Sequence, residues 1–310
     1  MTINKSIIFV GLFFVFANIS LHAQKDGELR ILSLVERIQP APESIFSMFR
    51  DAGMNPVNHI LTEIEREKVV RAFSILPPLH QKVLKEHLHS ISFMDNMPNT
   101  ALTSPVEISG STKKFNITFR AGIINETISK WASWKENTYY IKPGDSEYEV
   151  VVNAGNLDAI IYVLLHEATH IVDAVLNITP AVDEMDMVVS PTPFTTDVWH
   201  KMNVPKEEST NDVLETTRFR AGKPLPISSA PEIYQALQKS PFASLYSMAS
   251  WSEDLAELVT IYHLTKKMDQ PYEILVKNKG TTVFEYKPFA NKRVVKRKKI
   301  MGMFYSLKII

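Results

Sequence analysis

Apolar residues recur at helical spacing along the first third of the chain. The pattern runs from Gly27 to about Asp95 and is broken at Pro77-Pro78. No residue here points to chemistry, and the sequence leaves open whether this part is a helical lobe or a pro-segment covering a site. The Pro, Asn, Thr and Ser residues between Asn96 and Pro105 favour a boundary. We therefore expect a helical segment at 24–100 and a second region at 101–310.

The period of the apolar pattern changes to two beyond this boundary. Apolar and polar residues alternate at 115–119, and strands are also predicted at 139–141 and 148–152. The longest apolar run then extends from Ala159 to Leu176, which predicts a helix that is buried on all sides. Strands followed by a long buried helix predict an α+β fold.

The C-terminal part contains weaker signals. Residues 179–229 are rich in Pro, Thr, Ser and charge, and they predict a long connection with short helical pieces. Apolar alternation predicts a hairpin at 272–276 and 282–286. The stretch 290–307 is expected to be helical, and six of the eight residues at 292–299 are basic. Such a run is usually a solvated face, with an anionic partner as the less favoured alternative.

The composition limits the classes of partner and of chemistry. Lys+Arg and Asp+Glu both number 34 in 310 residues, so no overall field indicates nucleic acid or a membrane surface. The chain has no cysteine, which excludes a disulfide scaffold, a cysteine nucleophile and cysteine metal ligands. Stability must therefore come from packing, with a metal ion as a second source.

The N-terminus has the three regions of a secretory signal peptide. Lys5 precedes an apolar stretch at 7–19, and Leu21-His22-Ala23 offers a small residue for cleavage. We expect residues 1–23 to be removed and the protein to be exported, as a secreted or periplasmic protein. The apolar stretch is too short to span a bilayer, and no later segment is expected to span one. The sequence does not indicate the oligomeric state.

The strongest chemical signal lies inside the long apolar run. His166 and His170 are four residues apart, so a helix presents both imidazoles on one face, and Glu167 lies beside them. This is the zincin pattern of two zinc ligands and a general base. The alternative is a core helix with chance histidines, but burying these polar groups without a partner would cost several kcal/mol. The pattern therefore predicts one catalytic Zn²⁺.

A hydrolytic zinc site needs a third protein ligand and an open position for water. A metzincin would have Gly and His where this chain has Asp173 and Leu176, so that class is excluded. Glu253 and Glu257 share one face of a predicted helix and supply the carboxylates. The residues Ser250 to Glu253 also fit a capping box, so Glu253 alone could equally start a helix. The apolar helix and the need for a carboxylate favour ligation.

These motifs together resemble a known family. His-Glu-x-x-His followed by Glu-x-x-Ala-Glu, with a Tyr seven residues before the first Glu, is similar to the gluzincin zinc metallopeptidases, most closely the catalytic domain of anthrax lethal factor. The resemblance covers about residues 157–265 and implies a zincin-like catalytic domain. It implies the following roles: zinc ligands His166, His170 and Glu253; general base Glu167; oxyanion donor Tyr246; supporting groups Glu257 and Asp173.

The resemblance implies an exported zinc metallopeptidase that hydrolyses peptide bonds through an activated water. Its peptide or protein substrate is expected along the strand edge at 148–152. Two alternatives stay open: a non-catalytic zincin-fold binding module, and a metallohydrolase of non-peptide amides. Tyr262 and His263 are rivals of Tyr246 for the oxyanion role. His87 and His89 are two residues apart, and on a helix they would face different directions.

Overall fold

The computed structural model describes residues 34–106, 112–181 and 189–306. Within these residues the protein is α+β, with several small mixed or antiparallel sheets. The expected signal peptide, residues 1–23, lies outside the described residues.

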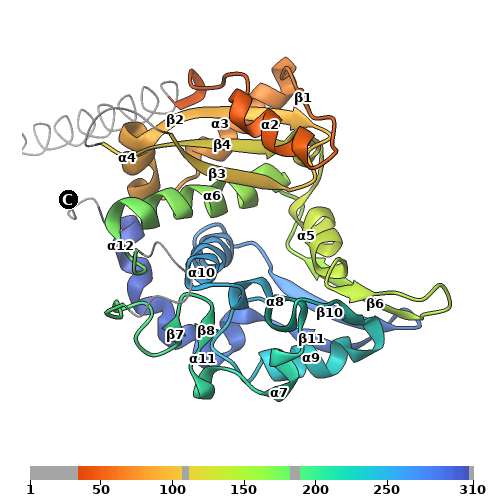
Figure 1. Ribbon diagram of the computed structural model, residues 1–310. Helices are drawn as coiled ribbons and strands as arrows, with labels where there is room; N and C mark the ends of the chain where they lie inside the picture. The colour runs from red at the N-terminus through yellow and green to blue at the C-terminus, as the bar shows by residue number, and fades with distance from the viewer. Residues whose placement is uncertain (1–33, 107–111, 182–188, 307–310) are drawn as a thin grey trace, which may run out of the picture.

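A four-stranded mixed sheet forms one side of the molecule (Figure 1). Its order is β1 (Val57–Asn58), β2 (Leu88–Asp95), β4 (Lys114–Arg120) and β3 (Ala101–Val106). The central strands β2 and β4 are parallel, and each outer strand is antiparallel to its neighbour. β3 is therefore an edge strand, and within the described residues it pairs only with β4.

Helices cover both faces of this sheet. Phe93 and Met94 are neighbours on β2, so their side chains point to opposite faces. Met94 packs in a small cluster with α2 (Glu43–Asp51), whereas Phe93 belongs to the main core. Several helices share the main core with Phe93, among them α3 (Glu63–Ser74), α4 (Pro78–His87) and α6 (Ala159–Leu176).

The structure differs from the helical pattern expected up to residue 95. Residues 88–95 form β2, which pairs with β4 from beyond the expected boundary. Six of its eight residues are buried, because helices cover both faces of the strand. A strand buried on both faces has a nearly continuous apolar run, which does not alternate and cannot be told from a buried helix by periodicity.

A second sheet contains the predicted hairpin. β10 (Glu273–Asn278) and β11 (Thr281–Tyr286) are antiparallel, and β10 also pairs with β6 (Tyr148–Asn153). Lys279 and Gly280 link the two hairpin strands with positive φ values of 52° and 75°. These are the conformations that a two-residue turn between twisted strands requires, so the hairpin prediction is confirmed.

The free edge of β6 is closed by a helix that the sequence did not reveal, α5 (Ile128–Asn137). The Val152 backbone N–H donates to the Ser133 hydroxyl at 2.8 Å, and the Asn137 amide donates to the Val150 carbonyl at 2.7 Å. These polar side chains are four residues apart on α5, and they take the place of a neighbouring strand. The expectation that a peptide lies along 148–152 is therefore wrong, because this edge is already paired.

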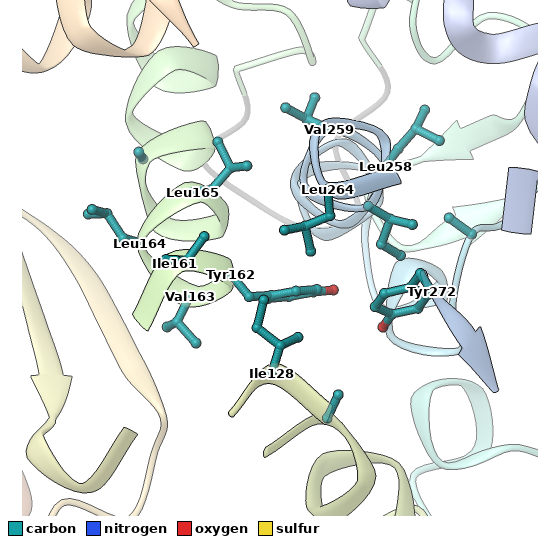
Figure 2. Close-up of a cluster of buried hydrophobic side chains, with 14 of the residues drawn as sticks. Ile128, Ile161, Tyr162, Val163, Leu164, Leu165, Leu258, Val259, Leu264 and Tyr272 are labelled. Carbon is teal, nitrogen blue, oxygen red and sulfur yellow. The ribbon is translucent and has the colours of Figure 1, made fainter. Parts of the chain in front are cut away.

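Helix α6 lies between the two parts of the molecule (Figure 1) and carries the core. Fourteen of its 18 residues are buried. It is long and apolar enough to cross a bilayer, which the sequence reading overlooked. However, it packs against other elements on all sides, as the core helix of a folded domain does. Figure 2 shows Tyr162 reaching from α6 into the space beside Tyr272, below α10 (Trp251–Lys266).

The remaining elements are short. The connection after α6 contains only small pieces, as predicted: β7 (Trp199–Lys201), β8 (Val204–Pro205), α7 (Asp212–Glu215), α8 (Arg218–Ala221), β9 (Leu225–Pro226), which pairs with β5 (Tyr140–Ile141), and α9 (Ala230–Leu237). The basic C-terminal stretch is three short helices, not one: α11 (Lys292–Lys296), η6 (Arg297–Met301) and α12 (Gly302–Tyr305).

Candidate metal centre

Two helices bring three possible metal ligands together. His166 and His170 come from one face of α6, and Glu253 comes from the first turn of α10. His166 Nε2 lies 2.9 Å from Glu253 Oε2 and 3.2 Å from His170 Nε2, and His170 Nε2 lies 3.4 Å from Glu253 Oε2. In the part of the chain that the structure describes, this is the one group of three such residues whose ligand atoms converge.

The spacing of these atoms fits a tetrahedral cation. Bonds of about 2.0–2.1 Å place the nitrogen and oxygen ligands of tetrahedral zinc about 3.3–3.4 Å apart. The three observed separations, 2.9, 3.2 and 3.4 Å, are close to this edge length. Two imidazoles and one carboxylate are also a donor set typical of catalytic zinc, with one position left for a further ligand. The residues therefore fit a metal ion of this kind.

Glu253 is available for ligation because a different residue caps its helix. The Ser250 hydroxyl accepts the backbone N–H of Glu253 at 3.3 Å. The carboxylate of Glu253 does not return to the Ser250 backbone but faces the imidazoles. The two explanations are therefore compatible. The backbone N–H of Glu253 takes part in capping the helix, and its side-chain carboxylate faces the candidate metal centre.

The electrostatics of the group favour a positive charge at its centre. Burial alone lowers the pKa of His166, but hydrogen bonds and charges from Glu253 and Glu257 outweigh it and raise the pKa to about 10. Burial raises the pKa of Glu253, yet the two histidines bring it well below its ordinary value. Protons on the imidazoles can balance the carboxylates, and so can a divalent cation, which displaces those protons when it binds.

Glu257 lies behind His166 in a closed hydrogen-bond network. Its Oε1 lies 3.2 Å from His166 Nδ1, and it accepts from the Tyr162 hydroxyl at 2.8 Å and from Lys135 Nζ at 2.9 Å. The Ser244 hydroxyl donates to the other oxygen at 2.7 Å. The carboxylate is fully buried. Glu257 therefore lies within ion-pair distance of the imidazole of a candidate metal ligand.

Lys135 was not found from the sequence. It comes from α5, and its ammonium group compensates the charge of Glu257 while lying 4.4 Å from the centre of the Tyr246 ring. A lysine on a polar helix face carries no sequence signal for such a role. Lys135 reaches Glu257 only because α5 packs beside α6 and α10, the two helices that carry the candidate metal ligands.

Glu167 is held by the edge of the four-stranded sheet. The Thr103 hydroxyl on β3 donates to Glu167 Oε2 at 2.7 Å. This contact fixes one carboxylate oxygen beside the histidines. Thr103 was also missed, because it lies in the Pro- and Thr-rich stretch that suggested a boundary.

Tyr246, to which the resemblance gives the oxyanion role, lies next to the triad. It begins the short helix η4 (Tyr246–Met248), and its ring centre is 6.0 Å from that of His166. Burial first, and then the charge of Glu253, raise the pKa of its hydroxyl, which keeps it protonated and able to donate a hydrogen bond. Its rivals lie elsewhere: Tyr262 packs on Phe289, and His263 stacks on Tyr305.

Asp173 interacts electrostatically with His170 and also has a structural role. Its two carboxylate oxygens accept from the backbone N–H and the hydroxyl of Thr179, each at 2.7 Å. The residue therefore fixes the chain where α6 ends, at Asn177 in the left-handed conformation. His87 and His89 form no metal pair, since His87 bonds the Lys113 carbonyl and His89 is exposed on β2.

A cavity of about 380 Å³ opens beside His166 and Glu167. Six aromatic side chains and two basic side chains, Lys135 and Arg218, are part of its walls. The aromatic residues are Trp131, Trp134, Tyr139, Tyr162, Phe219 and Tyr246. The start of β3 lines the same cavity through Ala101. The candidate metal centre therefore adjoins both a concave space with apolar and polar walls and a strand that, within the described residues, pairs on one side only.

No protein-family model, no curated protein and no solved structure matches this chain. The assignment of a function therefore depends on the residues and geometry of the site itself.

Proposed function

We propose that the protein is a zinc-dependent metallopeptidase with a zincin-like catalytic domain. The observation that carries this proposal is the convergence of His166, His170 and Glu253 at the spacing of a tetrahedral site, with Glu167 beside them. Zinc is favoured over harder cations because two of the three donors are imidazole nitrogens. When bound there, zinc would lower the pKa of a water and polarise a carbonyl group.

The protein side chains then divide the remaining work. Glu167 accepts a proton from the attacking water and delivers it to the leaving amine. The hydrogen bond from Thr103 keeps the carboxylate in position for both transfers. The protonated Tyr246 donates a hydrogen bond to the oxygen on which negative charge develops. Glu257 and its partners orient the imidazole of His166.

The substrate is a peptide that adds to the free edge of β3. This edge strand lines the cavity and contacts Glu167 through Thr103, so a peptide paired with it would pass the metal centre. The aromatic walls of the cavity suit a large apolar side chain of the substrate. We also infer export, from residues 1–23, and N-terminal sequencing of the mature protein tests whether cleavage follows Ala23.

The decisive experiment separates the metal from the base. Purified protein should contain one zinc per chain and cleave members of a peptide library, and a chelator should stop cleavage until zinc is restored. Glu167→Ala should keep the zinc and lower the rate about 10²- to 10⁴-fold, because it removes the base and none of the ligands. His166→Ala is the matched variant on the same helix, and it should lose both zinc and cleavage.

The opposite results are equally clear. Cleavage that persists in Glu167→Ala would exclude the proposed base, and full zinc content in His166→Ala would exclude the metal centre. Hydrolysis of non-peptide amides alone, with the same dependence on zinc and Glu167, would leave a metallohydrolase and overturn the peptidase. Zinc without hydrolysis of either kind would indicate a binding module.

A further inference from the structure

A second, larger cavity lies at the C-terminal end of the chain. It has a volume of about 890 Å³ and is formed by α11, η6 and the segment 193–198. None of the residues that line it also lines the cavity beside the metal centre. It falls within the range of about 300–1,000 Å³ that is typical of small-molecule sites.

The charge of this cavity is strongly positive. Its walls carry four basic side chains and one carboxylate, Asp197. The basic residues are Arg293, Lys296, Arg297 and Lys299. They belong to the C-terminal basic run, for which a solvated face was the favoured expectation. Five of the six basic residues of this run are exposed, so the solvated face is confirmed, and four of the six also line the cavity.

The four basic groups are not equivalent. Arg297 is held by Asp254 and by the Pro241 carbonyl, and Arg293 donates to the carbonyls of Lys239 and Glu208. The ammonium groups of Lys296 and Lys299 have no hydrogen-bond or ion-pair partner among the residues that the structure describes, and both side chains are exposed. The two arginines therefore stabilise the wall, while the two lysines keep their charge for a ligand.

The other part of the wall is apolar. The guanidinium of Arg297 lies 4.5 Å from the centre of the Phe194 ring and holds this ring against the cavity. Val198, which is buried, and Ile300 line the same space. A ligand that fills this cavity would thus meet an apolar surface and two free ammonium groups.

We propose that this cavity binds a small amphiphilic anion, a carboxylate or phosphate group carried on an apolar body. The anionic group pairs with Lys296 and Lys299, and the apolar body packs on Phe194, Val198 and Ile300. A simple inorganic anion would leave the apolar wall uncovered, and a neutral apolar molecule would leave the lysines without a partner. This site is independent of the proposed peptidase activity.

The test uses the full-length mature protein and four probes. Dodecanoate and dodecyl phosphate carry the two candidate head groups, decanol lacks the charge, and inorganic phosphate lacks the apolar body. In titration calorimetry below the micellar concentration, at least one amphiphilic anion should bind at one site per chain and bind more weakly as salt rises. The tighter of the two anions identifies the head group. Decanol and inorganic phosphate should bind at least about 10-fold more weakly.

Two double variants with the same change of charge localise the site. Lys296→Gln with Lys299→Gln should weaken binding of the anion about 10-fold or more, since it removes two charge-assisted contacts. Lys292→Gln with Lys298→Gln is the control, because both residues are exposed in the same stretch but do not line the cavity. This control should change the affinity less than about twofold. Melting temperatures verify that both variants fold.

Three outcomes would overturn the proposal. Equal losses in the two double variants would show a general attraction of anions to a basic surface. If inorganic phosphate bound as tightly as the amphiphilic anion, the apolar wall would not contribute to binding. If decanol bound as tightly, the lysine charges would not contribute. No saturable binding of either amphiphile would show that the cavity has no such ligand.

Discussion

Glu253 and Asp254 are neighbours on α10, yet they face two different kinds of environment. Asp254 is fully buried, accepts two hydrogen bonds from Arg297 at 2.8 and 2.5 Å, and accepts a third from the Trp199 indole at 2.8 Å. Glu253 faces His166 and His170. The first carboxylate has a permanent cation of the protein as its partner, whereas the second has groups that are cationic only when protonated.

This difference separates a carboxylate with a fixed structural partner from one that could bind a metal ion. Glu257 resembles Asp254 in this respect, because Lys135 compensates its charge and hydroxyl groups occupy its remaining lone pairs. Glu253 has no lysine or arginine as an ion-pair partner within the described residues. A buried cluster whose charge is balanced only by imidazoles is suited to exchange protons for a metal ion.

The largest expected effect is on zinc binding, and it comes from removing the carboxylate of Glu253. Glu253→Gln should abolish tight zinc binding, because it replaces an anionic ligand by a neutral amide. Glu257→Gln should weaken zinc binding about 10- to 100-fold, the usual cost of losing a partner of a ligating imidazole. Zinc stoichiometry and affinity, measured by competition with a chelator, compare the two variants directly.

The reverse pattern would contradict the comparison. If Glu253 served its helix only, Glu253→Gln would leave zinc in place. If Glu257→Gln lost zinc while Glu253→Gln kept it, Glu257 would be the ligand. The supporting role that we assign to Glu257 and its hydrogen-bond partners would then be wrong.

The second effect concerns stability and leaves the metal in place. Asp254→Asn leaves the charge of Arg297 uncompensated at the side of the core, and removing one partner of a buried ion pair costs about 3–5 kcal/mol of unfolding free energy. Urea denaturation measures this loss. The native variant should still bind zinc, because Asp254 contacts none of the three ligands. A variant of unchanged stability that lost zinc would show that Asp254 belongs to the metal centre.

A smaller effect is expected from the contact between β3 and the proposed base. Thr103→Val removes the hydrogen bond to Glu167 while it keeps the shape of the side chain. The rate of peptide cleavage should fall about 10-fold, and zinc content should not change. Ser104→Ala, at the next residue of the same strand, is the control and should leave the rate unchanged. An equal fall in both variants would indicate general disturbance of the strand.

The sequence predicted the parts of the site that lie on single helices. His166 and His170 are four residues apart, as are Glu253 and Glu257, so spacing alone places each pair on one helix face, with Glu167 beside the first pair. Ser250 was read correctly as the start of a helix. The hairpin was also predictable, because its turn has a local signature.

The parts that were missed depend on packing between distant segments. Thr103 reaches Glu167 from β3, and Lys135 reaches Glu257 from α5, across 64 and 122 residues of sequence. Neither residue type is unusual in a strand or on a helix surface. Asp173 is a related case, because its spacing matches the family pattern but does not reveal that its carboxylate accepts two hydrogen bonds from Thr179. The spacing of a motif fixes a helix face but not the partner it meets.

The smallest effect tests a third kind of cluster, in which the cation itself titrates. His59 contacts Asp95 at 3.0 Å and Glu65 at 3.2 Å, far along the chain from the metal centre. Burial lowers the pKa of His59, but these two carboxylates outweigh burial and raise it. Its stabilisation is therefore fully present below the unfolded pKa, about 6.5, and is lost as the pH rises through the higher folded value.

Unfolding of the zinc-saturated protein at pH 6 and pH 9 tests this sign. The wild type should lose more stability between these pH values than His59→Gln, by less than about 1 kcal/mol because the cluster is partly exposed. His89→Gln, which changes an exposed histidine on β2, should behave as the wild type does. If the stability of His59→Gln depended on pH as strongly as that of the wild type, titration of His59 would contribute nothing to stability. The distinction between permanent and titratable ion-pair partners would then not apply to this cluster.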